Sequence, residues 1–183
     1  VYKRQPLFVD RSVRVTPEGA LSFVYKASAE IGDLGDNTAR IRMSIAEDEL
    51  LARAISSPGA RVAVVGHARW ASVGIISEPN AHPVNSEVVG RVDGPYVIAS
   101  LNGDIDNYAD LAALEHIEFP AGITTDAKVI PALVSHRMTQ TETPLDAFRD
   151  TVATFEGSVA IALQSAANPD EVFLALRGSG QGC

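Results

Sequence analysis

Hydrophobic residues gather in short runs separated by turn-forming residues, a pattern that predicts a mixture of strands and helices. The predicted strands cover residues 7–9, 21–25, 61–66, 96–101, 158–163 and 172–176. The run at 61–66 is continuously apolar, which is typical of a buried strand. Pro17-Glu18-Gly19 and Asn168-Pro169-Asp170 are turn sequences, and the strand at 96–101 is expected to end at Asn102-Gly103.

Helical patterns fill much of the remaining chain. The predicted helices run from a cap at Asn37 through Ile55, from Asn107 to Glu115, from Asp126 to Met138 and from Thr143 through Val152. Ser57-Pro58-Gly59 and Gly157 are expected to end the first and the last of them. Pro131 predicts a bend or a late start in the third helix. A long irregular loop is expected from Trp70 to Gly94. The mixture favours an α+β fold with largely antiparallel pairing over a doubly wound parallel sheet.

Composition places the chain among ordinary globular domains. Its 183 residues predict one domain, and 46% hydrophobic and 21% charged residues exclude a disordered or fibrous chain. The net charge of −8, without a Lys/Arg cluster, argues against nucleic acid or an anionic membrane as a partner. No apolar run approaches the ~18 residues of a membrane span.

Cysteine and histidine usage points away from a metal or disulfide scaffold. Cys183 is the single cysteine, and the four histidines do not have a metal-ligand spacing such as HExxH. We therefore expect a cytoplasmic protein with no metal and no cofactor.

Three short segments carry residues suited to chemistry. Arg69, after the predicted strand at 61–66, offers paired donors for a carboxylate or phosphate, or it stacks on Trp70 or pairs at the surface. Asn102-Gly103 is either a hairpin turn or an oxyanion hole made by the Asn102 amide and the Gly103 N–H. Asp126 either belongs to a helix cap or holds a substrate ammonium. Together they form the set needed to bind an α-amino acid and hydrolyse its side-chain amide, apart from a nucleophile.

The segments resemble the glutaminase domain of class II glutamine amidotransferases, which are N-terminal-nucleophile hydrolases, and within them that of the glucosamine-6-phosphate synthases. The likeness runs from about Leu7 to Ser179. It rests on the order of residues 66–71, 77–78, 80–83, 101–103 with 107, 125–126 with 129–130, 155–160 and 176–179. It implies an αββα sandwich of largely antiparallel sheets. It also implies hydrolysis of L-glutamine to glutamate and ammonia, which passes to a sugar phosphate such as fructose 6-phosphate.

The resemblance also assigns roles to individual residues. Arg69 would bind the glutamine α-carboxylate, with Trp70 and Ser72 shaping that end of the site. Asp126 would hold the α-ammonium, and Asn102 with Gly103 would form the oxyanion hole. His82 is expected to support the loop rather than transfer a proton. Downstream phosphosugar isomerase domains and a homo-oligomeric full-length protein are implied as partners.

This sequence departs from the family pattern in several places. The family's nucleophile is an N-terminal cysteine whose own amine acts as the base, and we expect it on a strand upstream of Pro6. Cys183 does not replace it, because its α-nitrogen lies in a peptide bond. Val73 stands where the family carries histidine, and the stretch 85–95 is longer than usual.

Both ends of the sequence are expected to be artificial. Residues 1–5 resemble the translation of a sequencing-library transposon end, although a natural basic N-terminus is the alternative. On this interpretation residues 6–183 are an amidotransferase domain truncated at both ends, and the fragment alone is inactive. Two other hypotheses stay open. The chain is a non-catalytic amidotransferase-like regulatory or docking domain, or it is an acidic interaction domain whose long loop binds a partner.

Overall fold

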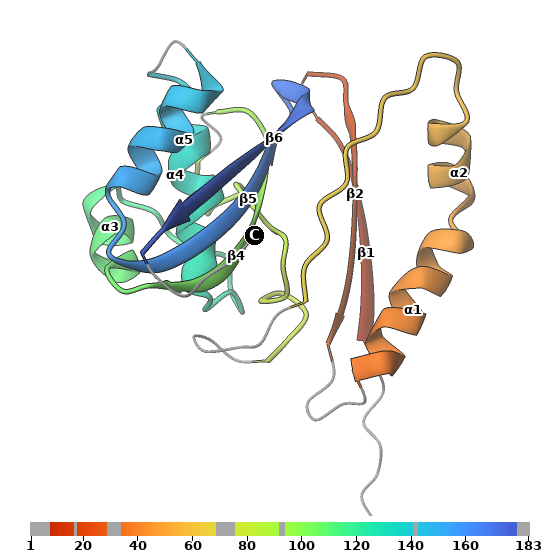
Figure 1. The fold of residues 1–183 in the computed structure, drawn as a ribbon, viewed down its shortest axis with the longest axis horizontal. Coiled ribbons are helices and arrows are strands. Elements are labelled where there is room, and N and C mark those ends of the chain that lie inside the picture. The colour runs from red at the N-terminus through yellow and green to blue at the C-terminus, as the bar shows by residue number, and fades with distance from the viewer. Residues whose placement is uncertain are drawn as a thin grey trace, which may run out of the picture.

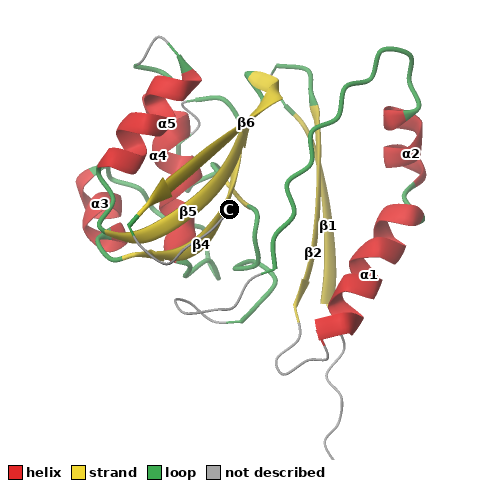
Figure 2. Cartoon of the chain, viewed as in Figure 1, coloured by secondary structure: helices red, strands yellow, loops and turns green. Residues whose placement is uncertain are grey.

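The structure, a computed structural model, describes residues 8–16, 18–28, 34–68, 76–91, 94–140 and 143–178. Two sheets lie between two groups of helices, so the order of layers is helix, sheet, sheet, helix (Figures 1 and 2). All strand pairs formed by these residues are antiparallel. The predicted α+β sandwich of largely antiparallel sheets is confirmed.

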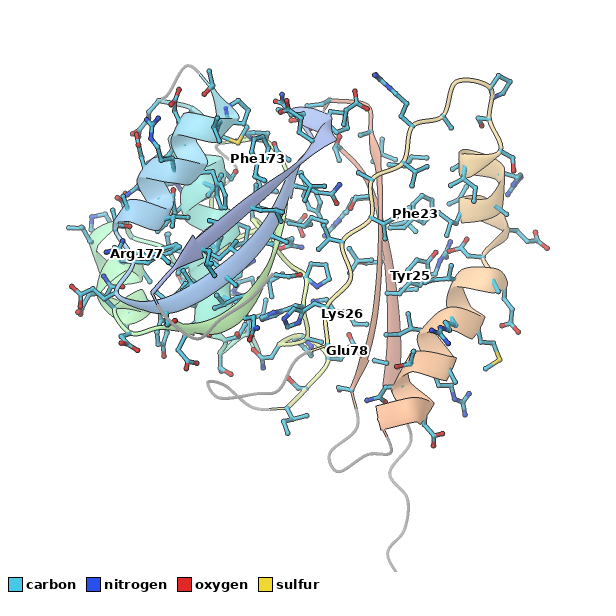
Figure 3. The ribbon with its side chains drawn as sticks, viewed as in Figure 1. Phe23, Tyr25, Lys26, Glu78, Phe173 and Arg177 are labelled. Atoms are coloured by element: carbon cyan, nitrogen blue, oxygen red, sulfur yellow. The ribbon has the colours of Figure 1, made fainter. Side chains whose placement is uncertain are left out.

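The smaller sheet consists of β1 (Phe8–Val15) and β2 (Leu21–Ser28), with Val15 opposite Leu21. Helices α1 (Leu34–Ala46) and α2 (Glu49–Ile55) cover its outer face. Figure 3 shows Phe23 and Tyr25 on that helical side of β2 and Lys26 on the other side, toward the larger sheet. Alternate residues of a strand point to opposite faces, so this division follows from the sequence.

The larger sheet has the order β3-β4-β5-β6. Its strands are β3 (Val84–Asn85), β4 (Val97–Ile105), β5 (Gly157–Ser165) and β6 (Asn168–Arg177). Helices α3 (Tyr108–Leu114), α4 (Val129–Arg137) and α5 (Pro144–Ala153) cover one face of it, and the 3₁₀ helix η1 (Asp126–Lys128) leads into α4. The hydrophobic core fills the space between this sheet and its helices.

The single helix predicted from Asn37 through Ile55 is wrong. The helix α1 begins at Leu34, so Asn37 lies inside it, and it ends before Asp48. The Asp48 carboxylate accepts hydrogen bonds from the backbone N–H groups of Leu50 and Leu51, each at 3.0 Å, and so caps α2. An aspartate that bonds to the backbone ahead of it starts a new helix rather than continuing the old one, which explains the break.

The buried strand predicted at 61–66 is also wrong. Residues 61–68 form no helix or strand and belong to neither sheet of the described structure, and the side chains of Val62 and Val64 are 61% and 81% exposed. An apolar run becomes a buried strand only where neighbouring strands take up its backbone hydrogen bonds. Hydrophobicity alone therefore misplaced this segment.

Two predicted turns lie inside strands. Strand β4 does not end at Asn102-Gly103 but continues to Ile105, with Asn102 opposite Ala160. The β5–β6 hairpin was expected, but it turns at Ala166-Ala167, where Ser165 pairs with Asn168. Asn168-Pro169-Asp170 belongs to β6, which is an edge strand of the described sheet and tolerates proline for that reason.

The other helix predictions fit more closely. The helix α3 covers most of the range predicted from Asn107, and α4 starts late, after η1, with Pro131 in its first turn. Thr143 caps α5 by accepting a hydrogen bond from the Asp146 N–H at 3.1 Å. Gly157 is the first residue of β5 rather than the end of α5. Of the helices described, none combines the length and apolarity needed to cross a membrane.

Candidate functional site

The candidate site is described in part. Asn102 and Gly103 lie in β4, and Asp126 is the first residue of η1. The expected glutamine-binding residues Arg69, Trp70 and Ser72 lie outside the described residues. The roles expected for them therefore remain predictions.

Asp126 is held directly against β4. Its Oδ2 atom accepts a hydrogen bond of 2.8 Å from the backbone N–H of Ile105, and the Thr125 hydroxyl donates to its Oδ1 atom at 3.3 Å. Ile105 is two residues beyond Gly103, a separation of roughly 7 Å along a strand. The fold thus brings the predicted ammonium-binding carboxylate to the strand that carries the predicted oxyanion hole.

The environment of Asp126 favours a cationic ligand. The residue is only 3% exposed, and this burial raises the pKa of its carboxyl group. The nearby Asp104 acts in the same direction, whereas the backbone N–H groups of Ile105 and Ala127 act against it. A buried carboxylate close to a second acid is stabilised when a positive charge binds beside it.

Gly103 has a backbone conformation that is unusual within a strand. Its φ angle is +109°, a region that L-amino acids with a side chain rarely adopt. A glycine inside a strand often marks a place where a ligand approaches the backbone closely. Its neighbour Asn102 is exposed and borders the same point of β4. The hairpin interpretation of Asn102-Gly103 is therefore wrong, and the pair occupies an accessible part of a strand.

Asn80, which precedes β3, fixes the loop at residues 122–125. The sequence pattern did not predict this role. The side chain is fully buried and makes four hydrogen bonds. Its Oδ1 atom accepts from the N–H groups of Thr124 (2.7 Å) and Thr125 (3.0 Å). Its Nδ2 atom donates to Ser77 Oγ (2.8 Å) and to the Gly122 carbonyl (3.1 Å). Asn80 thus orders the residues immediately before Asp126.

His82 contacts the other half of the site. Its Nδ1 atom accepts a hydrogen bond of 3.2 Å from the backbone N–H of Leu101, the residue before Asn102. Its ring centroid lies 4.8 Å from that of His67, so the segment 61–68 reaches β4 at this point. These contacts are structural ones, of the kind expected for His82 from the sequence.

A buried lysine follows Asp126 in the same 3₁₀ helix, and nothing in the sequence pattern pointed to it. The Lys128 side chain is fully buried. Its Nζ atom donates to the Asn85 carbonyl (2.6 Å), to Asn85 Oδ1 (3.0 Å) and to the Glu87 carbonyl (2.6 Å). Burial lowers the pKa of Lys128 to about 8, and the Lys26 charge acts in the same direction, against the Glu87 carboxylate.

We expect Lys128 to make the stability of the protein rise with pH. Its pKa is about 8 in the folded protein and 10.5 when unperturbed, so between these values the unfolded chain binds more protons than the folded one. The free energy of unfolding should therefore increase by about 2 kcal/mol from pH 8 to pH 10. Chemical denaturation at several pH values measures it. The increase should be absent in Lys128→Met, and an equal slope in the two proteins would contradict the assignment.

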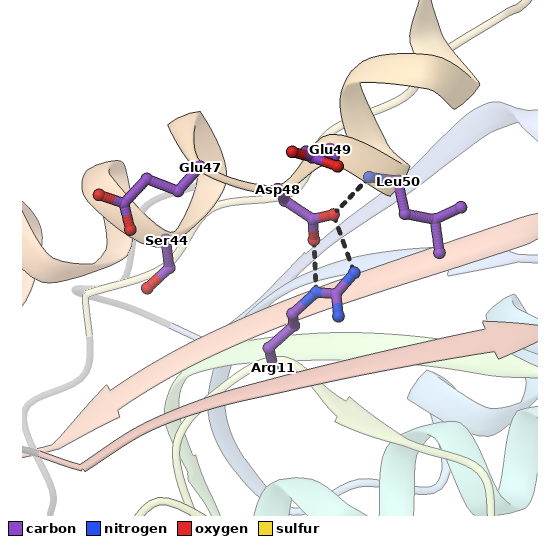
Figure 4. A pocket seen from close by; sticks show the side chains of 6 residues that line it. All are labelled: Arg11, Ser44, Glu47, Asp48, Glu49 and Leu50. Carbon is purple, nitrogen blue, oxygen red and sulfur yellow. Dashed lines mark hydrogen bonds and ion pairs between the residues drawn. The ribbon is translucent and has the colours of Figure 1, made fainter.

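One hollow lies away from these residues, at the junction of α1 and α2. It is open, about 450 Å³ in volume, and is bordered by Arg11, Ser44, Glu47, Asp48, Glu49 and Leu50 (Figure 4). Arg11 forms a bidentate ion pair with the Asp48 carboxylate, and the Tyr25 hydroxyl donates to that carboxylate at 2.6 Å. The Arg11 bonds, and after them the Tyr25 bond, hold the pKa of Asp48 well below its usual range. Burial, together with the hydrogen bond to Asp48, raises the pKa of Tyr25 to about 12. Because Asp48 also caps α2, we interpret this cluster as a structural joint.

The second hollow lies between the two sheets. It has a volume of about 220 Å³, and its lining includes Arg14 and Lys26 from the smaller sheet, Asn85 from β3 and Tyr96, the residue before β4. The cation of Arg14 is already paired with Glu87 at 2.8 Å. Within the part of the chain that the structure describes, no three His, Cys, Asp or Glu side chains come together as metal ligands would.

Comparison with known proteins identifies relatives for this arrangement. A curated glutamine–fructose-6-phosphate aminotransferase (isomerizing) from Acinetobacter baylyi is 34% identical over 116 residues, which is 63% of this chain and 18% of the relative. The enzymes of that name from Neisseria meningitidis serogroup A and Staphylococcus aureus are 33% and 32% identical. They match 62% and 64% of this chain and 18% and 20% of their own lengths.

Other comparisons add less. No family model matches the chain. Among solved structures, the glutamine phosphoribosylpyrophosphate amidotransferase from Bacillus subtilis, complexed with ADP and GMP, aligns with 55% of this chain and 20% of its own. The identity is 18% and the TM-score 0.41.

The chain thus spans about a fifth of the length of the curated relatives it matches. The matched part covers more than half of the present sequence, and the three relatives are 32–34% identical to it. The resemblance drawn from the sequence is confirmed: over about 60% of its length, this chain is similar to glutamine–fructose-6-phosphate aminotransferases.

Proposed function

We propose that residues 6–183 form the glutaminase domain of a glutamine amidotransferase similar to glutamine–fructose-6-phosphate aminotransferase. The domain hydrolyses L-glutamine to glutamate and ammonia. The ammonia is transferred to a sugar phosphate such as fructose 6-phosphate, which gives glucosamine 6-phosphate. Phosphosugar isomerase domains of the same protein would carry out that transfer, in a homo-oligomer located in the cytoplasm.

One geometric observation carries the proposal. The buried Asp126 carboxylate bonds to the Ile105 N–H, on the strand that holds Asn102 and Gly103. The proposed ammonium-binding carboxylate therefore lies beside the strand end that carries the two proposed oxyanion donors, as a site for an α-amino acid with a side-chain amide needs. The similarity to the aminotransferases supports the same conclusion independently of the geometry.

The chemistry divides into binding and stabilisation of charge. Asp126 pairs with the α-ammonium of glutamine, and Arg69 pairs with its α-carboxylate, with Trp70 and Ser72 beside it. The side-chain amide carbon is then presented to a thiolate. As the C–S bond forms, the carbonyl oxygen becomes negative, and the Asn102 amide and the Gly103 N–H donate hydrogen bonds to it.

The remaining steps return the enzyme to its starting state. The tetrahedral intermediate collapses, the C–N bond breaks and the nitrogen takes a proton and leaves as ammonia. Water then hydrolyses the thioester to glutamate and restores the thiol. The thiolate belongs to an N-terminal cysteine that the resemblance implies and that these residues do not include.

We predict that Arg69→Ala raises the KM for glutamine roughly 10- to 100-fold in the full-length protein. The guanidinium makes charge-assisted hydrogen bonds to a substrate carboxylate, which are worth roughly 1.5–3 kcal/mol each. Because the α-carboxylate is equally charged in the ground and transition states, kcat should change little. Steady-state kinetics of glutamate release measure both constants.

Arg61→Ala is the matched control, because this exposed arginine pairs with Asp170 at the surface. Its KM should equal that of the wild type. An unchanged KM in Arg69→Ala would remove Arg69 from the site. A full-length protein that releases no glutamate from glutamine would contradict the proposed function, and the regulatory or docking hypothesis would then take its place.

A further inference from the structure

The 3₁₀ helix η1 is fixed from two sides by one stretch of chain, the 77–87 segment. On the side before Asp126, Asn80 accepts hydrogen bonds from the backbone of Thr124 and Thr125. On the side after it, Lys128 Nζ reaches back to oxygen atoms of Asn85 and Glu87. Asp126, between these two attachments, is the residue whose carboxylate meets β4.

Lys128 is buried with three hydrogen bonds, whereas an apolar core side chain needs none. Removing an ammonium group from water is costly unless its donors find acceptors, and here all three contacts are oxygen atoms within 3.0 Å. Two of these oxygens belong to Asn85, which pairs with Ile98 of β4. Lys128 therefore ties η1 to β3, the neighbour of the strand that Asp126 contacts.

We propose that Lys128 is a positioning residue for glutamine binding: by joining η1 to Asn85 and Glu87, it holds the Asp126 carboxylate in place for the substrate ammonium. This inference rests on the proposed function. It adds a residue that does not touch the substrate and that acts through Asp126. Asn80 binds the residues before Asp126, and Lys128 fixes the chain after it.

The side chain of Lys128 is suited to this task because it is long enough to reach Asn85 and Glu87 and its ammonium group can donate to three oxygen atoms. Methionine has a similar length and is apolar, so Lys128→Met keeps the volume and removes the three hydrogen bonds. Without them, η1 keeps the bonds at Thr124 and Thr125 on its N-terminal side and the Asp126 bond to the Ile105 N–H, but it loses its attachment on the C-terminal side. Asp126 would then hold the ammonium less tightly, while the oxyanion donors on β4 stay where they are.

The test is a double-mutant cycle on the KM for glutamine in the full-length protein. Lys128→Met is expected to raise KM about tenfold with little change in kcat, because ammonium binding contributes equally to the ground and transition states. In the background Asp126→Asn, which has lost that contact, adding Lys128→Met should change KM less than twofold. Residues that act through one another show such non-additivity, whereas independent ones do not.

Thr151→Val serves as the control for general loss of stability. Thr151 is fully buried in α5 and its hydroxyl donates to the Ala147 carbonyl at 2.7 Å, away from η1. This variant should lower the melting temperature and leave KM unchanged. If Lys128→Met does not fold, Asn85→Ala removes one of the three acceptors and should raise KM about threefold, again only when Asp126 is present.

The outcomes separate the two claims. A wild-type protein without glutaminase activity overturns the proposed function and this inference together. An active wild type in which neither Lys128→Met nor Asn85→Ala changes KM overturns the inference alone. A KM effect that persists in full in Asp126→Asn also overturns it, because Lys128 would then act by another route.

Discussion

Replacing Asn102 with alanine is expected to reduce the kcat for glutamine hydrolysis by roughly 10²- to 10³-fold in the full-length protein. The loss of one oxyanion-hole donor has an effect of this size because the donor acts on charge that develops only in the transition state. The KM for glutamine should stay nearly constant, since the ground-state carbonyl gains little from the same bond. Asn102 is exposed in β4, so the change should cost little stability.

The appropriate control comes from the neighbouring strand. Gln164 in β5 lies opposite Ile98, on the same face of the sheet as Asn102 but four residues away along the register. Gln164→Ala should keep the wild-type kcat, measured as glutamate released at saturating glutamine. If Asn102→Ala also keeps it, Asn102 does not stabilise the oxyanion and the assignment of the pair Asn102-Gly103 fails.

The sequence predicted those parts of the structure that depend on local chemistry. The cap of α5 at Thr143 and the late start of α4 around Pro131 follow from backbone geometry that a few neighbouring residues determine. The antiparallel pairing of β5 with β6 was expected for the same reason, although its turn is at Ala166-Ala167. Such features need no knowledge of what lies across the molecule.

The errors occur where distant residues decide the outcome. Asn102-Gly103 is a strong hairpin sequence, yet β5 pairs with β4 on both sides of it and keeps the strand continuous. The predicted helix breaks at Asp48, whose carboxylate caps α2 and is also bound by Arg11 and Tyr25, far away in sequence. The run at 61–66 has the composition of a strand, but the described sheets offer it no neighbour.

In the candidate site, too, the sequence predicted what neighbouring residues determine and not what distant residues determine. Asp126 was found from its place before a helix, and its contact with Ile105 could not be read from that pattern. No role was predicted for Lys128, nor for Asn80 beyond its place in the 80–83 motif, because nothing local distinguishes a buried, fully bonded side chain from an exposed one. Their contacts are visible only once the 77–87 segment and η1 lie side by side.

Asn80→Ala is expected to lower the free energy of unfolding of this chain by about 4 kcal/mol. The substitution leaves the N–H groups of Thr124 and Thr125 and the Gly122 carbonyl without their partner, and it opens a cavity at a fully buried position. A buried polar group without a partner costs about 1–3 kcal/mol, which applies in full to the buried Thr125 N–H. Gly122 and Thr124 are exposed residues, so the loss of their bonds adds less, and the cavity at the buried Asn80 position adds the rest. The melting temperature should fall by roughly 8–16 °C.

The comparison variant is Asn168→Ala, which makes the same chemical change at the surface. Asn168 bonds through its side chain to Glu171 at 3.0 Å, in an exposed part of β6 where water can replace the bond. Its effect should stay within about 0.5 kcal/mol. Chemical denaturation of both variants decides the matter. Equal stabilities would mean that the loop before Asp126 is held by contacts other than Asn80. A large difference would show that this one amide orders the approach to the candidate site, because the two variants lose the same atoms and differ only in what those atoms touch.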